Sequence, residues 1–241
     1  AEQFGTLESL YPGRVDLGLG RAPGTDPETL RALRRDHHSA ANRFPQDVQE
    51  LLHFLEPAQP GQRVQAVPGA GTGVPVWILG SSLFGAQLAA ALGLPYAFAS
   101  HFAPDMLDEA LKVYRENFQP SGQLEKPHAM LALPAVPADS MQEAQRLATT
   151  SYQRILALFR GQPLWMKPPV DTMEGLWNAG EKASVKDFLG LQLLGDADTI
   201  RRQLDQILSD IEVEELMFTV DIYDPDKRRH ALDILAQTRT D

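Results

Sequence analysis

The fold is decided by residues 75–100, PVWILGSSLFGAQLAAALGLPYAFAS, in which the hydrophobic period changes twice. Residues 75–79 form a short apolar run typical of a strand, and residues 80–82 form a small polar break. Residues 83–92 are rich in Ala and Leu at helical spacing, and residues 96–99 are apolar again. The stretch therefore predicts a strand, a tight loop, a helix and a second strand.

The tight loop of this stretch has the composition of an anion site. In a parallel strand–helix–strand unit, it lies at the carboxyl end of the first strand, where α/β proteins bind ligands. Gly80 permits close approach to the backbone, and Ser81 and Ser82 place hydroxyls beside the free amides of a helix N-terminus. The loop thus suits a phosphate. An ordinary N-cap is the alternative interpretation, because Ser is a preferred capping residue.

The alternation of strand and helix continues on both sides of this stretch. Strands are predicted at residues 14–20, 75–79, 96–99, 128–136, 191–194 and 215–220, and a closing helix at 226–237. Pro134 is expected to cut the strand in which it lies, and Asp139 is expected to cap the helix over 141–159. About five strand–helix units in succession predict an α/β fold with a parallel sheet or barrel.

Two segments break this alternation. Residues 62–67 alternate like a short exposed strand. Residues 162–186 have no periodicity and hold Trp165 and Trp177 among prolines and glycines. A long aperiodic segment inside a domain predicts a lid or an insertion loop, and a locally disordered insertion is the alternative. The two tryptophans are candidates for binding a planar substrate, or they pack against the body of the protein.

Arg21 and His101 each follow a predicted strand. Arg21 lies in a Gly-rich turn after the strand at 14–20, which makes it a candidate anion ligand or a solvated loop residue. His101 follows the strand at 96–99 and is the best-placed histidine of the chain. It is a candidate ligand or acid–base group, with a structural role as the alternative.

The composition excludes several classes of function. The chain has 241 residues, 43% of them hydrophobic, and a net charge of -10, which favours one globular unit with a small-molecule partner over a nucleic-acid surface. The absence of cysteine excludes disulfides and thiolate sites and is compatible with a cytoplasmic location. The six histidines show no metal-ligand spacing, and the apolar runs are too short for a membrane helix. We therefore expect no metal, membrane or nucleic-acid partner.

Five phrases of the chain, taken together, resemble the bacterial luciferase-like flavin monooxygenases, in particular the luciferase-family oxidoreductases of bacteria. They are AEQFGTLESLYPGRVDLGLGRAPGTD (1–26), NRFPQDVQEL (42–51), PVWILGSSLFGAQLAAALGLPYAFASHF (75–102), LLGDADTIRRQL (193–204) and EELMFTVDIYDPDKRRHALDILA (214–236). Each phrase is weak alone, but their order and spacing are specific. The resemblance runs along essentially the whole chain, 1–241.

This resemblance implies a (β/α)8 TIM barrel, as a single partial domain. By the comparison, Ala1 falls near the end of the third strand–helix unit, so the first three units are expected to be missing. The active-site histidine of the family falls in that missing portion. No catalytic residue is therefore assigned, and His101 is the only candidate considered within this chain.

The resemblance also implies a set of flavin-binding residues on the phosphate side. The arginine that the family has after strand four resembles Arg21, and a second phosphate-side arginine resembles Arg43. The phosphate loop after strand five resembles Gly80, Ser81, Ser82 and Gly85. In luciferase itself, the positions of Ser81 and Gly85 hold an acidic residue and a Thr. Backbone amides can contact a phosphate despite that change.

The activity implied by the resemblance is the oxygenation of a small organic substrate by reduced FMN and O₂. A separate NAD(P)H–flavin reductase is the expected source of reduced FMN, a deazaflavin is an alternative cofactor, and a homodimer or larger homo-oligomer is expected. Two other functions are compatible with the same residues. One is a non-catalytic flavin-binding protein of the same fold, and the other is an unrelated barrel enzyme acting on a phosphorylated metabolite.

Overall fold

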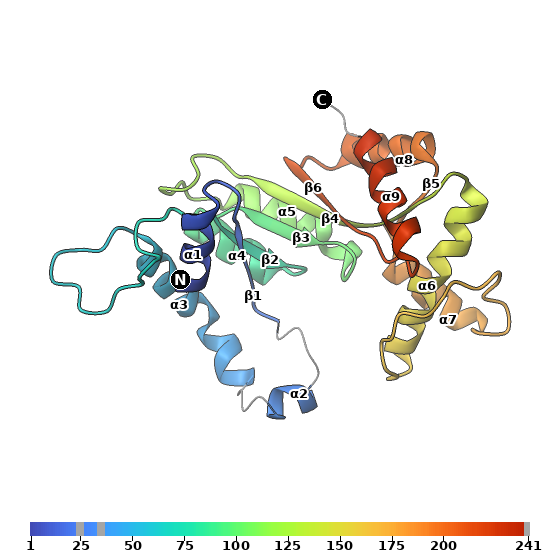
Figure 1. Cartoon of the computed structure of the whole chain (residues 1–241), viewed down its shortest axis with the longest axis horizontal. Coiled ribbons are helices and arrows are strands. Elements are labelled where there is room, and N and C mark those ends of the chain that lie inside the picture. The colour runs from blue at the N-terminus through green and yellow to red at the C-terminus, as the bar shows by residue number, and fades with distance from the viewer. Residues whose placement is uncertain (23–26, 33–36, 239–241) are drawn as a thin grey trace. The chain divides into compact units, whose positions relative to one another are not determined.

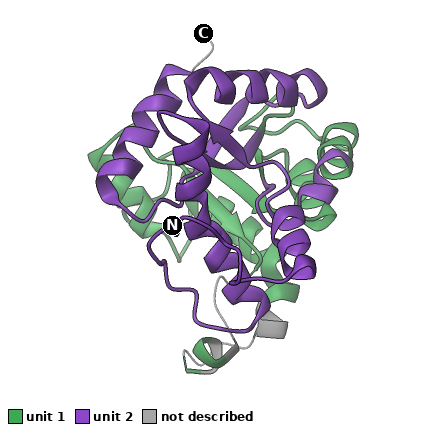
Figure 2. Cartoon of the chain, turned by 90° about the vertical axis from the view of Figure 1, so that its right-hand side faces the viewer, with its two compact units in different colours: residues 1–98, 109–129 green, residues 99–108, 130–241 purple. Residues whose placement is uncertain are grey.

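The computed structural model describes residues 1–22, 27–32 and 37–238 of the chain (Figure 1). The chain divides into two compact units, shown in different colours in Figure 2. Unit 1 comprises residues 1–98 and 109–129, and unit 2 comprises residues 99–108 and 130–241. No helix within the described ranges is both long enough and apolar enough to span a bilayer.

Unit 1 is built on three parallel strands in the order β1–β2–β3. Ile78 of β2 is in register with Leu19 of β1 and with Tyr96 of β3. The elements of this part of the chain are α1 (Glu2–Leu10), β1 (Leu17–Gly20), α2 (Pro27–Ala32), α3 (His37–Leu55), β2 (Val76–Gly80), α4 (Leu83–Leu92), β3 (Tyr96–Ala99) and α5 (Leu107–Glu116).

The predicted strand–loop–helix–strand unit is confirmed as β2, α4 and β3, with β2 and β3 parallel. Gly93 ends α4 in the left-handed conformation at φ 64°, and a Cβ at this position would lie 2.4 Å from the Gln119 carbonyl oxygen. Glycine is required there because any side chain would meet both backbone strain and a steric clash. The tight end of α4 returns the chain directly into β3.

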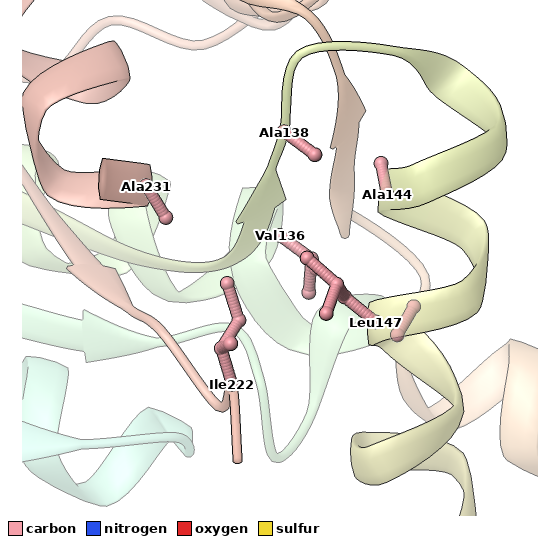
Figure 3. Packing of buried hydrophobic residues seen from close by; sticks show 7 residues of the cluster. Val136, Ala138, Ala144, Leu147, Ile222 and Ala231 are labelled. Carbon is pink, nitrogen blue, oxygen red and sulfur yellow. The ribbon is translucent and has the colours of Figure 1, made fainter. Parts of the chain in front are cut away.

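Unit 2 contains three parallel strands, in which β4 pairs with both β5 and β6. Its elements are the 3-10 turn η1 (Pro104–Met106), β4 (Ala129–Pro137), α6 (Met141–Phe159), α7 (Ala179–Phe188), β5 (Leu193–Gly195), α8 (Ala197–Asp210), β6 (Glu215–Thr219) and α9 (Pro225–Gln237). Figure 3 shows part of its core, where Val136, Leu147 and Ile222 pack between β4, α6 and the segment after β6. This packing fixes the carboxyl end of β4 against α6.

Strand β4 continues through Pro134, so the expected interruption at this residue is wrong. All nine residues of β4 are buried. Pro134 is the last residue of β4 in register with β6, opposite Thr219, and Ala135 is the first in register with β5. The proline lacks a backbone N–H, but it stands where the pairing passes from one neighbour to the other, where a missing donor is best tolerated.

The cap of α6 is Ser140, not Asp139 as the sequence pattern predicted. The Ser140 hydroxyl accepts from the Glu143 backbone N–H at 3.2 Å. Asp139 instead pairs with His230 of α9, with 2.6 Å between Oδ1 and Nε2, and this hydrogen bond lowers the pKa of the Asp139 carboxyl. A tertiary partner therefore takes the acidic side chain away from the helix terminus.

The strand predicted at 62–67 is absent, and this segment consists of bends and irregular structure that lead into a turn at Val67. Gln62 organises them: its amide oxygen accepts from the Gln59 N–H at 3.0 Å, and its amide nitrogen donates to the Val64 carbonyl at 2.9 Å. These local bonds satisfy backbone groups that a strand would pair with a neighbour. Val64 and Val67, which suggested the alternation, are both exposed.

The segment predicted as a lid or insertion loop, 162–186, consists of two parts. It runs without helix to Asn178, and α7 begins at Ala179. Asn178 and Glu181 form a capping box, in which each side chain accepts from the other residue's backbone N–H, at 2.9 and 2.8 Å. The helical start at this point follows from that local pair.

Candidate functional site

The loop between β2 and α4 presents the start of a helix without a side-chain cap. Ser82 occupies the N-cap position with extended backbone, at φ -150° and ψ 164°, but its hydroxyl makes no capping hydrogen bond. The first backbone amides of α4 therefore receive no acceptor from Ser82, although they carry the positive end of the helix dipole. Ser81 and Ser82 are both partly buried. The interpretation of Ser82 as an ordinary side-chain cap is not supported.

Tyr96 packs against this loop and donates a hydrogen bond to it, a role that sequence analysis did not predict. The Tyr96 hydroxyl donates to the Ser82 carbonyl at 3.3 Å, and burial raises the pKa of the phenol, which keeps it protonated as a donor. A Cβ on Gly85 would lie 3.2 Å from the Tyr96 ring, and one on Gly80 would lie 3.7 Å from it. The two glycines therefore let the ring pack directly beneath the loop.

Arg21 brings a positive charge to the first turn of α4. Its guanidinium carbon lies 4.0 Å from the centroid of the Phe84 ring, which is a cation–π contact. Phe84 is the second residue of α4, and Arg21 itself is exposed. The structure therefore brings together Arg21 and the helix that begins after Ser81 and Ser82. Residues 23–26 of the turn after Arg21 lie outside the described residues.

Arg43, the second predicted phosphate ligand, makes a different contact. It lies on α3 with a side chain that is 71% exposed, and its Nη2 is 3.3 Å from Oδ1 of Asp47 on the same helix. An exposed pair at this spacing contributes little to stability and leaves the arginine free to change partners. Its role as a flavin ligand stays a prediction.

A cavity of about 410 Å³ lies entirely within unit 2. Its floor is the carboxyl end of β4 and the end of β6, and its walls come from α6, α7 and the segment after β3. The lining is mostly apolar, and the residues are His101, Phe102, Pro134, Ala135, Val136, Ser151, Arg154, Ile155, Leu158, Leu164, Phe188, Leu189, Gln192, Thr219 and Asp221. His101 thus lines a pocket at strand carboxyl ends, as its sequence position indicated.

An ion pair is the main polar feature of this cavity. Nη2 of Arg154 on α6 contacts Oδ2 of Asp221, which follows β6, and the two side chains are 39% and 27% exposed. The Ser151 hydroxyl lies 3.5 Å from the Asp221 backbone carbonyl. Sequence reasoning missed both charged residues. Asp221 could have been noticed, because it follows a predicted strand in the way that His101 does.

His101 is held mainly in its neutral form. Burial lowers the pKa of its imidazole, while the Ala132 carbonyl and Asp221 oppose this shift and Arg154 adds to it. Its Nδ1 and the Nε2 of Gln192 are buried without a hydrogen-bond partner in the described part of the chain. Two polar atoms of the cavity wall thus have hydrogen-bonding capacity that the described residues do not use.

The two predicted substrate-binding tryptophans lie in different environments. Trp177 stacks on Tyr152 of α6 at a centroid distance of 5.7 Å and packs beside Ile155 and Met173. Trp165 is 78% exposed. The residue that the same loop contributes to the cavity is Leu164.

Comparison with known proteins identifies the relationship. The family model described as luciferase-like monooxygenase matches residues 1–214. A luciferase-like monooxygenase of Escherichia coli K12 is 47% identical over 234 residues, which cover 97% of this chain and 70% of that protein. The crystal structure of apo-MsnO8 shares 28% identity at a TM-score of 0.80, covering 99% of this chain and 72% of that one.

More distant structures share the fold. One is the oxygenating constituent of 3,6-diketocamphane monooxygenase from Pseudomonas putida, a type II Baeyer–Villiger enzyme in complex with FMN, with a TM-score of 0.61 and 16% identity over 98% of this chain and 73% of that one. Another is an F420-dependent secondary alcohol dehydrogenase, with a TM-score of 0.59 and 14% identity over 99% and 74%. The expected α/β fold with a parallel sheet, similar to luciferase-like TIM-barrel proteins, is thereby confirmed. The chain belongs to the luciferase-like monooxygenase family.

Proposed function

We propose that the protein is an FMN-dependent monooxygenase that uses O₂ to oxygenate a small organic substrate, and that the β2–α4 loop binds the FMN phosphate. The observation that supports this proposal is the position of Arg21 over Phe84, beside a helix start that Ser82 leaves uncapped. A phosphate carries about two negative charges, and a guanidinium with helix-terminal amides is the donor set that suits it. The donors of the loop therefore fit the proposed group.

Each part of the loop has a distinct role in this proposal. Arg21 neutralises charge, and the hydroxyls of Ser81 and Ser82 with the first amides of α4 donate to the phosphate oxygens. Gly80 and Gly85 keep the loop thin enough for close approach, because Tyr96 leaves little room beneath it. Bound FMN would supply the redox chemistry with O₂. The protein's own part is to bind and orient the cofactor and to limit the access of water.

The wider proposal concerns partners. Reduced FMN comes from a separate NAD(P)H–flavin reductase, and the protein forms a homodimer or larger homo-oligomer in a cytoplasmic setting. Arg43 serves as a second phosphate ligand by exchanging Asp47 for the phosphate, and Trp165 and Trp177 contribute to substrate binding. His101 remains the candidate acid–base group, supported by its position in the cavity at the carboxyl ends of strands.

A deazaflavin is the alternative cofactor, since one neighbour in fold is an F420-dependent enzyme and another was solved with FMN. The decisive test is a titration of the purified chain with FMN and, separately, with F420, followed by absorbance and by flavin fluorescence. Saturable binding of FMN with a spectral shift supports the proposal. If the chain binds F420 but not FMN, the proposed cofactor is the deazaflavin. If it binds neither, a flavin function for this chain is contradicted.

A second experiment separates an enzyme from a non-catalytic flavin carrier. The chain is mixed with FMN, NADH and a flavin reductase, and O₂ consumption is recorded while candidate organic compounds are added. Consumption that a compound stimulates, with an oxygenated product detected by mass spectrometry, supports a monooxygenase. Binding of FMN without any stimulated consumption would favour the carrier, whereas affinity for phosphorylated metabolites but not FMN would favour the unrelated barrel enzyme.

A further inference from the structure

Arg154 and Gln192 bring hydrogen-bond donors to the cavity of unit 2. The guanidinium of Arg154 carries five N–H groups, and its described contact, to Asp221, is made through Nη2. Gln192 adds an amide nitrogen to the same wall that is buried without a hydrogen-bond partner among the described residues. A ligand with acceptor atoms would satisfy the Gln192 amide nitrogen and could use the remaining N–H groups of Arg154, and a buried donor without an acceptor is costly.

The remainder of the cavity suits an apolar body. Phe102, Leu158 and Leu164 line it and are exposed, at 61%, 45% and 51%, although they are large hydrophobic side chains. Phe188 and Ile155 continue the apolar wall on α7 and α6. The volume of about 410 Å³ lies in the range of small-molecule sites. The cavity thus combines a mostly apolar lining with the ion pair of Arg154 and Asp221.

Asp221 holds the Arg154 guanidinium in place through one of its nitrogens and leaves the others for a ligand. The aspartate fixes one side of the guanidinium through Nη2, and the arginine stays the more exposed partner, at 39% against 27%. A fixed, partly exposed guanidinium is suited to a carboxylate, whose two oxygens match its fork of N–H donors. The same arrangement gives an alcohol only one weaker hydrogen bond.

We infer that this cavity binds a small organic acid, with its carboxylate on Arg154 and its apolar body against Phe102, Ile155 and Leu158. Asp221 acts as the positioning residue for Arg154. The inference rests on the proposed function, because the acid is then the substrate, or the part of the substrate that is recognised. Charge-assisted hydrogen bonds are about twice as strong as neutral ones, so an acid is expected to bind about tenfold more tightly than the matching alcohol.

The test uses two probes of equal size, 3-phenylpropanoate and 3-phenylpropan-1-ol, titrated into the full chain without flavin and followed by calorimetry. The expected result is at least about tenfold tighter binding of the acid. In Arg154→Gln, the acid should lose that advantage while the alcohol changes little. Equal affinities for the two probes in the unchanged chain would overturn the proposal, as would an undiminished preference for the acid in Arg154→Gln.

Arg146→Gln is the matched control. Arg146 lies on the same helix and is also paired with an aspartate, with 3.0 Å between its Nε and Oδ1 of Asp171, but it does not line the cavity. This variant should keep the full preference for the acid. Because Arg154→Gln leaves Asp221 without its cation, the double variant Arg154→Gln with Asp221→Asn is measured as well. It should retain the fold and bind both probes equally, and a retained preference for the acid would contradict the role of Arg154.

Two further measurements separate this inference from the proposed function. Arg21→Ala should weaken FMN binding and leave the affinity for 3-phenylpropanoate unchanged, since Arg21 belongs to the other unit. A chain that binds 3-phenylpropanoate through Arg154 but does not bind FMN would support the inference and contradict the flavin function. Displacement of 3-phenylpropanoate by FMN would show that the cofactor occupies the cavity, and would overturn the assignment of the cavity to an acid.

Discussion

The guanidinium carbon of Arg21 lies 4.0 Å from the centre of the Phe84 ring. Arg21 follows β1, and Phe84 lies in the first turn of α4, so the contact joins the loop after β1 to the helix that follows the neighbouring strand β2. It holds a positive charge next to the helix start that Ser82 leaves uncapped. The phenyl ring thereby helps to hold a cation where the proposed phosphate would bind.

This contact predicts how FMN affinity depends on the two residues. Arg21→Ala should lower the affinity about tenfold or more, because a charge-assisted contact to the phosphate is lost. Phe84→Leu should lower it by a smaller factor, because the arginine remains but loses the ring that holds it. Flavin fluorescence titration measures both values. An Arg21→Ala variant with unchanged affinity would remove Arg21 from the site, and Arg43→Ala measured alongside decides the role of the second arginine.

Removal of the buried Tyr114 hydroxyl should destabilise the protein. This hydroxyl donates to the Leu94 carbonyl at 2.9 Å and accepts from the His128 N–H at 3.0 Å. Tyr114→Phe removes the hydroxyl but keeps the ring, so it should lower the free energy of unfolding by about 1 to 3 kcal/mol. Urea denaturation followed by circular dichroism measures the change. Tyr11→Phe is the control, since Tyr11 is 53% exposed, and an equal effect of both variants would contradict the role of the hydroxyl.

Ser140 and Asp139, which are adjacent at the start of α6, should contribute differently to stability. Ser140→Ala removes the acceptor for the Glu143 N–H and should lower the free energy of unfolding by about 1 kcal/mol. Asp139→Ala leaves this cap intact and removes an exposed pair with His230, so its effect should be smaller. Thermal and urea denaturation of the two variants compare them directly. A larger loss in Asp139→Ala would show that the aspartate, not the serine, stabilises the helix start.

His101 predicts a pH dependence of stability. Burial lowers the pKa of its imidazole below the ordinary 6.5, so the unfolded chain binds a proton more readily than the folded chain does. The free energy of unfolding should therefore fall as the pH drops below about 6.5 and continue to fall until the folded-state pKa is reached. His101→Gln should reduce the slope over this range. Urea denaturation between about pH 5 and pH 8 tests this, and an unchanged slope in the variant would contradict it.

Local patterns accounted for the elements whose stability depends on neighbouring residues. The unit from β2 to β3 followed from two changes of hydrophobic period. The closing helix predicted at 226–237 is observed as α9, where the Asp224 carboxylate accepts from the Asp226 and Lys227 N–H groups. The same patterns failed where a distant residue competed. Asp139 pairs with His230 of α9 and Ser140 caps α6, and Pro134 stands inside β4 at the last position that is in register with β6.

The candidate sites also differ in whether neighbouring or distant residues form them. The amino-acid sequence determined the loop of Gly80, Ser81 and Ser82 and the position of Arg21 after a strand, because each depends on a few consecutive residues. Tertiary structure alone decided that Tyr96 supports this loop and that Arg154 and Asp221 meet in one cavity. The physical reason is that these contacts join residues far apart in the chain, whose proximity is set by helix and sheet packing and has no local signal in the sequence.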